Sequence, residues 1–167
     1  LKYGAARPLL GGAGNVAANL VAYGAGVTLV GMTGIDEAAK ELAAICAKHA
    51  SLDARFIADP GRPTTVKTRY LGGWHQLLRV DAEDASPLSD DAAAPLLALV
   101  ATASIDAGCL VLSDYAKGVL TVQDWISGVP AYNTPAYYFV QNSPPVPTRA
   151  MRPLFEVISV EIDQFHA

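Results

Sequence analysis

A glycine-rich turn near the start of the chain carries the clearest chemical signal. Gly11, Gly12 and Gly14 let the backbone bend and come close to a ligand, and the apolar spacing that follows predicts a short helix. The first turn of a helix offers free N–H groups and a positive dipole end. Asn15 lies in that turn, where its amide can both donate and accept hydrogen bonds. A polyol or a phosphate is therefore the expected ligand.

Charged residues in the middle of the chain lie on short segments of alternating character. Alternation places Lys67 and Arg69 on one face of an expected strand. On the next strand, Arg79 and Asp81 share a face. Turn pairs that contain glycine separate these segments, so the stretch 55–81 is expected to form a small antiparallel sheet. From the pattern alone, solvated cross-strand ion pairs explain these charges better than a ligand site does.

Asp114 and Lys117 follow the apolar run Cys109–Ser113, which predicts a buried strand. Ligands of α/β proteins collect at the carboxyl ends of strands, which is where these two side chains are placed. A structural ion pair explains the two residues equally well. The sequence leaves both explanations open.

The elements that position these residues are typical of an α/β protein. Val27–Gly31 is a continuous apolar run of the kind found in buried parallel strands. Asp36 is expected to cap a helix that continues to about His49, and Ser89 begins the cap of a third helix. The stretch 1–10 contains a proline and few strand-forming residues, so it predicts a loop.

The last part of the chain, residues 129–167, has a different character. Prolines occur too often for a central strand, and no helical period is sustained. Only Phe155–Ile162 has the pattern of a strand. This segment is therefore expected to be a divergent, proline-rich tail and the least regular part of the protein.

A dinucleotide-binding domain is an alternative for the glycine turn. Gly12–Ala17 fits the fingerprint G-x-G-x-x-G/A, but that fingerprint requires a hydrophobic strand directly before it. Because the stretch 1–10 predicts a loop, the sequence disfavours this alternative.

Composition restricts the remaining function classes. The formal net charge of -4 argues against a nucleic-acid surface, and no apolar run is long enough to span a membrane. The cytoplasm is the expected location. Cys46 and Cys109 lie in apolar patterns and are expected as buried core thiols, so neither a disulfide nor a zinc site is expected. Asp81, Glu83 and Asp84 predict a solvated loop because they lack the spacing of a calcium loop.

Several spaced motifs together resemble the ribokinase-type carbohydrate kinases. The turn Gly11-Gly12 with Asn15, followed by Gly24 and Gly34, is similar to the first signature of that family. Three further segments resemble one branch, the bacterial heptose-7-phosphate kinases, which often form the N-terminal half of a bifunctional ADP-heptose synthesis enzyme. These segments are Arg62–Arg69, His75–Asp81 and Ser113–Thr121. The resemblance runs from about Arg7 to Thr121.

The resemblance implies a fold and a reaction. The fold would be a three-layer ribokinase-like sandwich, here partial, over residues 1–128, with a small antiparallel β lid at 55–81 through which a homodimer can form. The reaction would transfer the γ-phosphoryl group of ATP, with magnesium, to the 1-hydroxyl of a heptose 7-phosphate, a step toward lipopolysaccharide core precursors.

The resemblance also implies roles for individual residues. Gly11, Gly12 and Asn15 would hold sugar hydroxyls. Lys67 and Arg69, with Arg79 as a weaker candidate, would reach anionic oxygens from the lid. Asp114 and Lys117 would line the floor of the pocket.

The family's Gly-Ala-Gly-Asp loop, which provides the catalytic Asp and part of the nucleotide site, has no counterpart in this sequence. No catalytic residue is therefore assigned, and the isolated chain is expected not to transfer phosphate. A catalytically inactive sugar-phosphate-binding or interaction module is the alternative from a different class.

Overall fold

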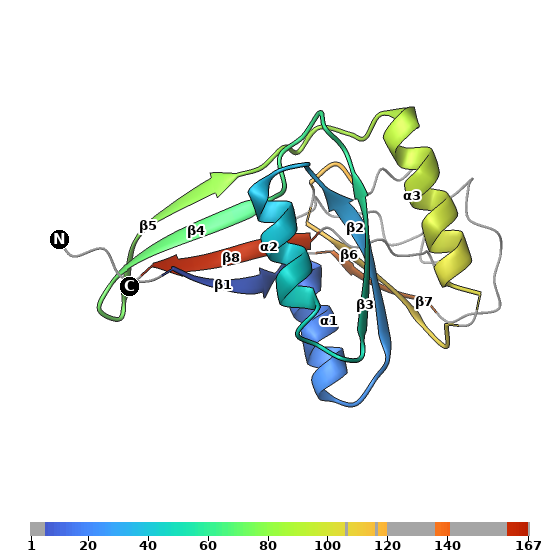
Figure 1. Cartoon of the computed structure of the whole chain (residues 1–167), viewed down its shortest axis with the longest axis horizontal. Helices are drawn as coiled ribbons and strands as arrows, with labels where there is room; N and C mark the ends of the chain where they lie inside the picture. Colours follow the sequence, from blue (N-terminus) through green and yellow to red (C-terminus); the bar gives the residue numbers. More distant parts are fainter. Residues whose placement is uncertain (1–5, 106, 116, 120–135, 141–159, 167) are drawn as a thin grey trace.

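A computed structural model describes residues 6–105, 107–115, 117–119, 136–140 and 160–166 of the 167-residue chain. Helices and strands alternate in its first part, as expected for an α/β protein (Figure 1). In chain order the elements are β1 (Ala6–Gly11), α1 (Gly12–Ala22), β2 (Val27–Thr33), α2 (Glu37–Cys46), β3 (Leu52–Ala58), β4 (Val66–Gly72), β5 (His75–Ala82), α3 (Asp90–Ala103), β6 (Leu110–Asp114), β7 (Ala136–Val140) and β8 (Val160–His166).

A four-stranded mixed sheet joins the two ends of the described chain. Its strand order is β1-β8-β4-β5, in which β8 runs antiparallel to β1 and parallel to β4, and β4 and β5 form an antiparallel pair. Figure 1 shows this sheet extending to the side of the molecule opposite α3. The expected small antiparallel unit is thus present as β4 and β5, here called the lid, within a larger sheet.

The strand β1 corrects the expectation of a loop before the glycine turn. Ala6–Gly11 pairs with β8 along its whole length, from Ala6 opposite His166 to Gly11 opposite Glu161. A proline is compatible with this strand because β1 lies at the edge of the sheet, where one side of the backbone needs no partner.

The lid is shorter than the stretch 55–81, because β3 belongs elsewhere. β3 pairs in parallel with β2, with Val30 opposite Arg55 and Thr33 opposite Ala58. The helix α2 makes the connection between them, as parallel neighbours require a long crossover. The antiparallel unit therefore begins at Val66.

A second correction concerns residues 129–167, where the sequence predicts only one strand. Ala136–Val140 forms β7, which pairs in parallel with β6. Its five residues are apolar or aromatic, a composition that favours a strand in a parallel sheet. The predicted strand at 155–162 overlaps β8 at 160–162, and its first part lies outside the described residues.

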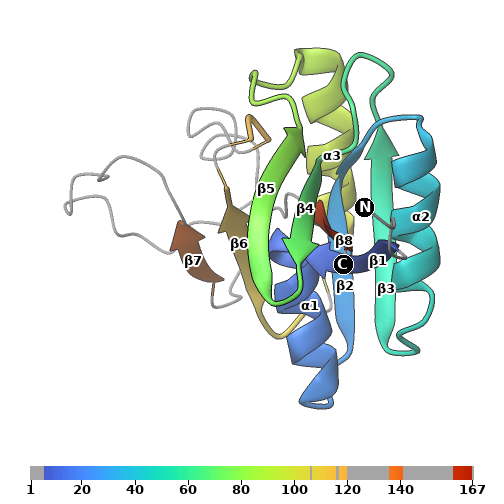
Figure 2. The same cartoon turned by 90° about the vertical axis from the view of Figure 1, so that its left-hand side faces the viewer.

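The core is built around β2, which is buried on both faces. Leu29 packs in one cluster with residues of α1, α2 and β3, and Val30 and Met32 pack in another with α3 and β6. Figure 2 shows β2 and β3 side by side, with α2 next to them. Burial on both faces explains the continuous apolar run Val27–Gly31, so this prediction of a buried strand is confirmed.

The two cysteine thiols differ in burial, although both were expected in the core. Cys46 ends α2 and is buried in the first cluster, as expected. Cys109 is exposed, which corrects the expectation of a core thiol. Cys109 comes one residue before β6, so it does not share the burial of the strand residues that follow it.

Candidate functional site

The glycine turn joins β1 directly to α1. Gly11 ends the strand in an extended conformation and caps the helix without a side-chain hydrogen bond. Gly12 has a φ of 49°, a left-handed conformation that glycine adopts far more easily than other residues. Asn15 is exposed on the helix, so its amide faces solvent and is accessible to a ligand.

The sheet register brings this turn near the lid. Leu10 lies opposite Ile162 of β8, and Ile162 lies opposite Val66 of β4. Strands in a sheet are about 4.8 Å apart, so Leu10 and Val66 are separated by roughly 10 Å. Lys67 is level with Leu9 through Asp163 of β8, so the glycine turn begins two residues further along β1 than the level of Lys67 and two strands away from it.

Lys67 is largely buried, and carboxylates surround its ammonium group. It is only 8% exposed, and its Nζ lies 3.0 Å from Asp81 Oδ2 and 2.8 Å from Glu83 Oε2. Lys67 and Asp81 are cross-strand neighbours, as the pattern alone suggested. The pair is buried rather than solvated, however, so its charges are less screened than those of a surface pair.

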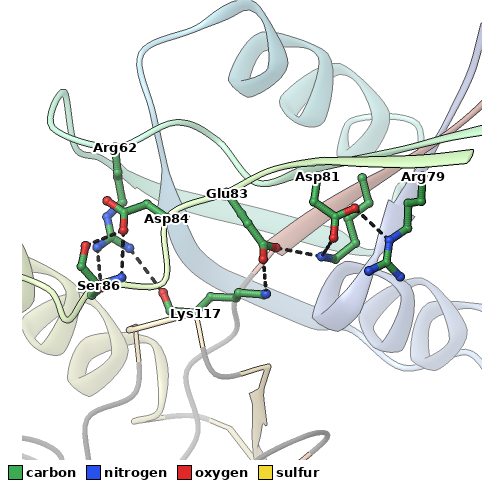
Figure 3. A network of polar contacts seen from close by, with 8 residues as sticks. Arg62, Arg79, Asp81, Glu83, Asp84, Ser86 and Lys117 are labelled. Atoms are coloured by element: carbon green, nitrogen blue, oxygen red, sulfur yellow. Dashed lines mark hydrogen bonds and ion pairs between the residues drawn. The ribbon is translucent and has the colours of Figure 1, made fainter.

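Lys117 is held by the other oxygen of the same glutamate. Its Nζ lies 2.6 Å from Glu83 Oε1, so Glu83 bridges a lysine of the lid and a lysine of the loop after β6 (Figure 3). The solvated loop expected at Asp81, Glu83 and Asp84 is corrected for Asp81 and Glu83, whose side chains are about three-quarters buried in ion pairs.

Burial and ion pairing act on the pKa values of these carboxylates in opposite directions. Burial alone would raise the pKa of Glu83, but hydrogen bonds from Lys117 and Lys67 outweigh it and hold the pKa below its usual value. For Asp81, burial is again opposed by Lys67 and Arg79, which lower the pKa. Both carboxylates are therefore charged at neutral pH.

Arg62 fixes the backbone beneath this network, a role that the sequence pattern did not indicate. Its side chain is 8% exposed, and it donates from Nη2 to the Ser86 carbonyl at 2.9 Å and from Nη1 to the Lys117 carbonyl at 3.5 Å (Figure 3). Its Nε has no hydrogen-bond partner in the described part of the chain and lies 3.5 Å from Asp59. Arg62 begins Arg62–Arg69, one of the segments that resemble the heptose-7-phosphate kinases. This resemblance was the feature of the sequence that could have indicated a role for Arg62.

Gly118 allows the loop after β6 to approach the segment after β5. Its φ is 72°, and a Cβ at this position would lie 1.8 Å from the Ser86 carbonyl oxygen. The Leu88 N–H also donates to the Gly118 carbonyl at 3.1 Å. These contacts, with those of Arg62, fix the backbone around Lys117.

The remaining predicted residues are less closely connected. Arg69 lies opposite Arg79 in the β4–β5 register, and Arg79 Nε is 2.9 Å from Asp81 Oδ1. Asp114 is the last residue of β6, and its side chain lies outside the described part of the structure. The structure thus joins Lys67, Lys117 and Arg79 through two carboxylates and places the glycine turn across the sheet from them.

Residues suitable for a magnesium–nucleotide site do not gather here. Within the described residues, no three His, Cys, Asp or Glu side chains lie close enough together to hold a metal ion. Asp81 and Glu83 already neutralise lysines. The described residues therefore do not form a magnesium–nucleotide site.

A cavity of about 560 Å³ lies elsewhere, between α1, α3 and the first residues of β2 and β6. Leu20, Val27 and Leu110 are among the residues that line it, and none of the residues predicted for the site does so. Ligands of α/β proteins bind at the carboxyl ends of strands, whereas this cavity is at the amino ends. It is not part of the candidate site.

The strand pairing also bears on the alternative of a dinucleotide-binding domain. A dinucleotide fold requires the strands before and after the glycine-turn helix to pair in one parallel sheet, but β1 and β2 belong to different sheets. Among the described residues, no helix combines the length and apolar character needed to cross a bilayer.

Comparison with known proteins relates this chain to a bacterial family. It is 52% identical over 113 residues to the bifunctional protein HldE of Caulobacter vibrioides. The matched region covers 68% of this chain and 23% of that protein. About two thirds of the chain is homologous to a segment of HldE. The HldE proteins of Paramagnetospirillum magneticum and Azorhizobium caulinodans are 45% identical over 112 residues and 46% identical over 122 residues.

The match to HldE is partial in both directions. The regions shared with the HldE proteins of Paramagnetospirillum magneticum and Azorhizobium caulinodans cover 67% and 72% of this chain, respectively. They cover 23% and 26% of those two proteins. The chain therefore spans about a quarter of the length of the curated relatives it matches. No family model matches the chain.

Proposed function

We propose that this chain is part of the sugar-binding half of a carbohydrate kinase that phosphorylates heptose 7-phosphate at the 1-hydroxyl. Such a reaction belongs to ADP-heptose synthesis for the lipopolysaccharide core and would take place in the cytoplasm. The observation that carries the proposal is the identity of 42% to 52% with HldE proteins over about two thirds of the chain. The ATP and magnesium of this reaction would bind outside the described residues.

In this proposal the glycine turn binds the sugar. The backbone N–H groups of Gly11 and Gly12 and the exposed amide of Asn15 contact hydroxyl groups. Asp114, at the carboxyl end of β6, lines the floor of the pocket. Phosphoryl transfer depends mainly on positioning and charge stabilisation, so holding the sugar in one orientation is the contribution of these residues.

The basic residues of the lid and the floor bind the phosphate of the sugar. An ammonium group has three donors, and the ion pair of Lys117 with Glu83 occupies one of them, which leaves donors for a phosphate oxygen. Arg79 is about half exposed and supplies a second charge, together with Arg69 opposite it. Lys67 contributes its charge from inside the network, where Asp81 and Glu83 hold it.

Isothermal titration calorimetry with heptose 7-phosphate, unphosphorylated heptose and NAD tests this function. We expect the phosphorylated sugar to bind more tightly than the free sugar, and NAD not to bind. Asn15→Ala should weaken sugar binding by about 1 to 3 kcal/mol through lost hydrogen bonds. Asn19→Ala, on the next turn of the same helix and also exposed, is the matched control and should leave binding unchanged.

The same titration separates the alternatives. Binding of NAD without binding of heptose 7-phosphate would contradict the kinase proposal and favour a dinucleotide site. Because the chain alone is expected not to transfer phosphate, the coupled ADP-release assay uses the chain completed with a Gly-Ala-Gly-Asp segment. Tight binding of heptose 7-phosphate without ADP release by that protein would favour an inactive sugar-phosphate-binding module.

We also propose that two copies of the chain associate through the lid. β5 is an edge strand that is exposed along its length apart from the largely buried side chain of Asp81, and the adjoining Trp74 is 99% exposed. Leu77, Leu78 and Val80 are exposed on the same strand. An exposed edge with apolar side chains favours pairing with another strand, and a second copy offers the same edge.

A further inference from the structure

Glu83 lies at the junction of the lid and the floor of the candidate site. One of its carboxylate oxygens contacts Lys67 on β4, and the other contacts Lys117 in the loop after β6. We infer that Glu83 is a positioning residue, which orients the ammonium group of Lys117 toward the phosphate of the sugar. This inference rests on the proposed function and adds a residue that the sequence placed in a solvated loop.

Glu83 is anchored to the lid through the buried Lys67. Its Oε2 lies 2.8 Å from the buried Lys67, and Lys67 also lies 3.0 Å from Asp81. Asp81 in turn contacts Arg79 at 2.9 Å. Because these residues lie on paired strands or directly after them, the carboxylate of Glu83 is fixed to the lid (Figure 3).

Lys117 combines a fixed backbone with a flexible side chain. Its backbone is fixed by the bond from Arg62 to its carbonyl and by the close approach of Gly118 to Ser86. Its side chain is a flexible four-carbon stem that ends in a point charge. The 2.6 Å contact with Glu83 gives that charge a defined place before a ligand arrives.

Glu83 has two opposing effects on the binding of a phosphate. The negative charge of Glu83 reduces the attraction of the lysines for a phosphate, but it also removes the need to order Lys117 during binding. Restricting a side chain to its bound orientation lowers the entropic cost of association. Only 17% of the Lys117 side chain is exposed, so it has already lost most of its freedom in this structure. The inference requires pre-ordering to be the larger effect, and the direction of the change in Kd on Glu83→Gln decides between the two.

A double-mutant cycle tests whether Glu83 acts through Lys117. The variants are Glu83→Gln, Lys117→Ala and the double variant, titrated with heptose 7-phosphate and with unphosphorylated heptose. Glu83→Gln should raise the Kd for the phosphorylated sugar about tenfold and change the Kd for the free sugar less than about twofold. In the Lys117→Ala background, Glu83→Gln should have no further effect.

Two additional variants keep the test independent of folding. Glu37→Gln makes the same change in a glutamate–lysine pair on the exposed surface of α2, and it should bind both sugars as the unmodified protein does. Glu83→Asp keeps the charge, so the fold is retained, but the shorter side chain cannot reach both lysines. It should weaken binding of the phosphorylated sugar selectively, though less than Glu83→Gln does.

Three outcomes would overturn the inference. The first is tighter or unchanged binding of heptose 7-phosphate by Glu83→Gln, which would make Glu83 a competitor or a bystander. The second is an equal loss for both sugars, which a structural role predicts. The third is an unchanged effect of Glu83→Gln in the Lys117→Ala background. In each case the unmodified protein still binds heptose 7-phosphate, whereas failure of the proposed function would abolish that binding and remove the inference with it.

Discussion

Asp36 and Thr64 are joined by two hydrogen bonds, although they are 28 residues apart. The Thr64 hydroxyl donates to Asp36 Oδ1 at 2.7 Å, and the Thr64 N–H donates to Asp36 Oδ2 at 2.9 Å. The same hydroxyl accepts from the Gly34 N–H at 2.9 Å. Because Asp36 also caps α2 through the Ala39 N–H, the start of that helix is tied to the segment that leads into β4.

Thr64→Val should destabilise the protein by removing this hydroxyl. The Gly34 N–H would be buried without a partner, and Asp36 would lose one donor, so the free energy of unfolding should fall by about 1 to 3 kcal/mol. Thr102→Val is the control, because the Thr102 hydroxyl is exposed and bonds only within its own helix. Its effect should stay within about 0.5 kcal/mol. Urea unfolding of both variants gives the comparison, and equal losses would contradict the prediction.

Gly118→Ala should be more harmful than an alanine at another glycine with positive φ. Gly24 has a φ of 89° with no atom within 4 Å of an added Cβ, so Gly24→Ala costs only backbone strain, about 1 to 2 kcal/mol. At Gly118 the added Cβ also meets the Ser86 carbonyl, which adds about 1 to 3 kcal/mol of overpacking. Chemical denaturation of the two variants measures the difference, and an equal cost at both positions would show that the contact with Ser86 is unimportant.

The stability of the protein should decrease in acid. The folded-state pKa of Glu83 lies below its usual 4.5, and those of Asp36 and Asp81 lie below 3.8. A lowered pKa means that the unfolded chain binds protons more readily, so the stabilisation is complete above these usual values. It is lost as the pH falls through the lower folded-state values.

Unfolding in urea at a series of pH values between neutral and strongly acid checks this pH dependence. Glu83→Gln removes one of the titrating groups and should flatten the decrease below about pH 4.5. Asn19→Ala, which changes an exposed residue without a titrating group, should follow the curve of the unmodified protein. If the Glu83→Gln curve also ran parallel to the curve of the unmodified protein, the ion pairs of Glu83 would not be the cause of the loss of stability in acid.

Leu78→Lys should separate the proposed dimer. The change places a charge on the edge strand β5, where a second copy would otherwise pair, and like charges would then meet across the interface. Ile35→Lys puts the same charge on another exposed apolar residue, before α2, and should leave the dimer intact. Sedimentation equilibrium measures the association. A monomeric unmodified protein would refute the lid interface at once.

The sequence predicted best those elements whose residues act locally. Val27–Gly31 was recognised as a strand because burial on both faces leaves a continuous apolar run, and Asp36 was recognised as a helix cap because a cap needs only the residues next to it. Ala6–Gly11 was missed because its proline is acceptable only at a sheet edge. The position of an edge depends on β8, which lies far away in the sequence.

The sequence singled out Lys67 and Lys117 as candidate cations of the site, but it did not indicate the carboxylate that connects them in the structure. Lys67 and Lys117 stood out by their motifs, and the structure brings both to Glu83. These contacts join residues 16 and 34 positions apart, so no local spacing indicates them. Arg62 was overlooked as a site residue for the same reason, since its partner Ser86 is 24 residues away.

The position of β8 between β1 and β4 has a consequence for the order in which the protein can assemble during synthesis. β2, α2 and β3 are consecutive, so their parallel pair and its helix can form early from local contacts. The four-stranded sheet must wait for Val160–His166, because β1 and β4 touch β8 rather than each other. Until those residues leave the ribosome, the β4–β5 hairpin carries an unpaired edge on each side, and the nascent chain is exposed to aggregation there.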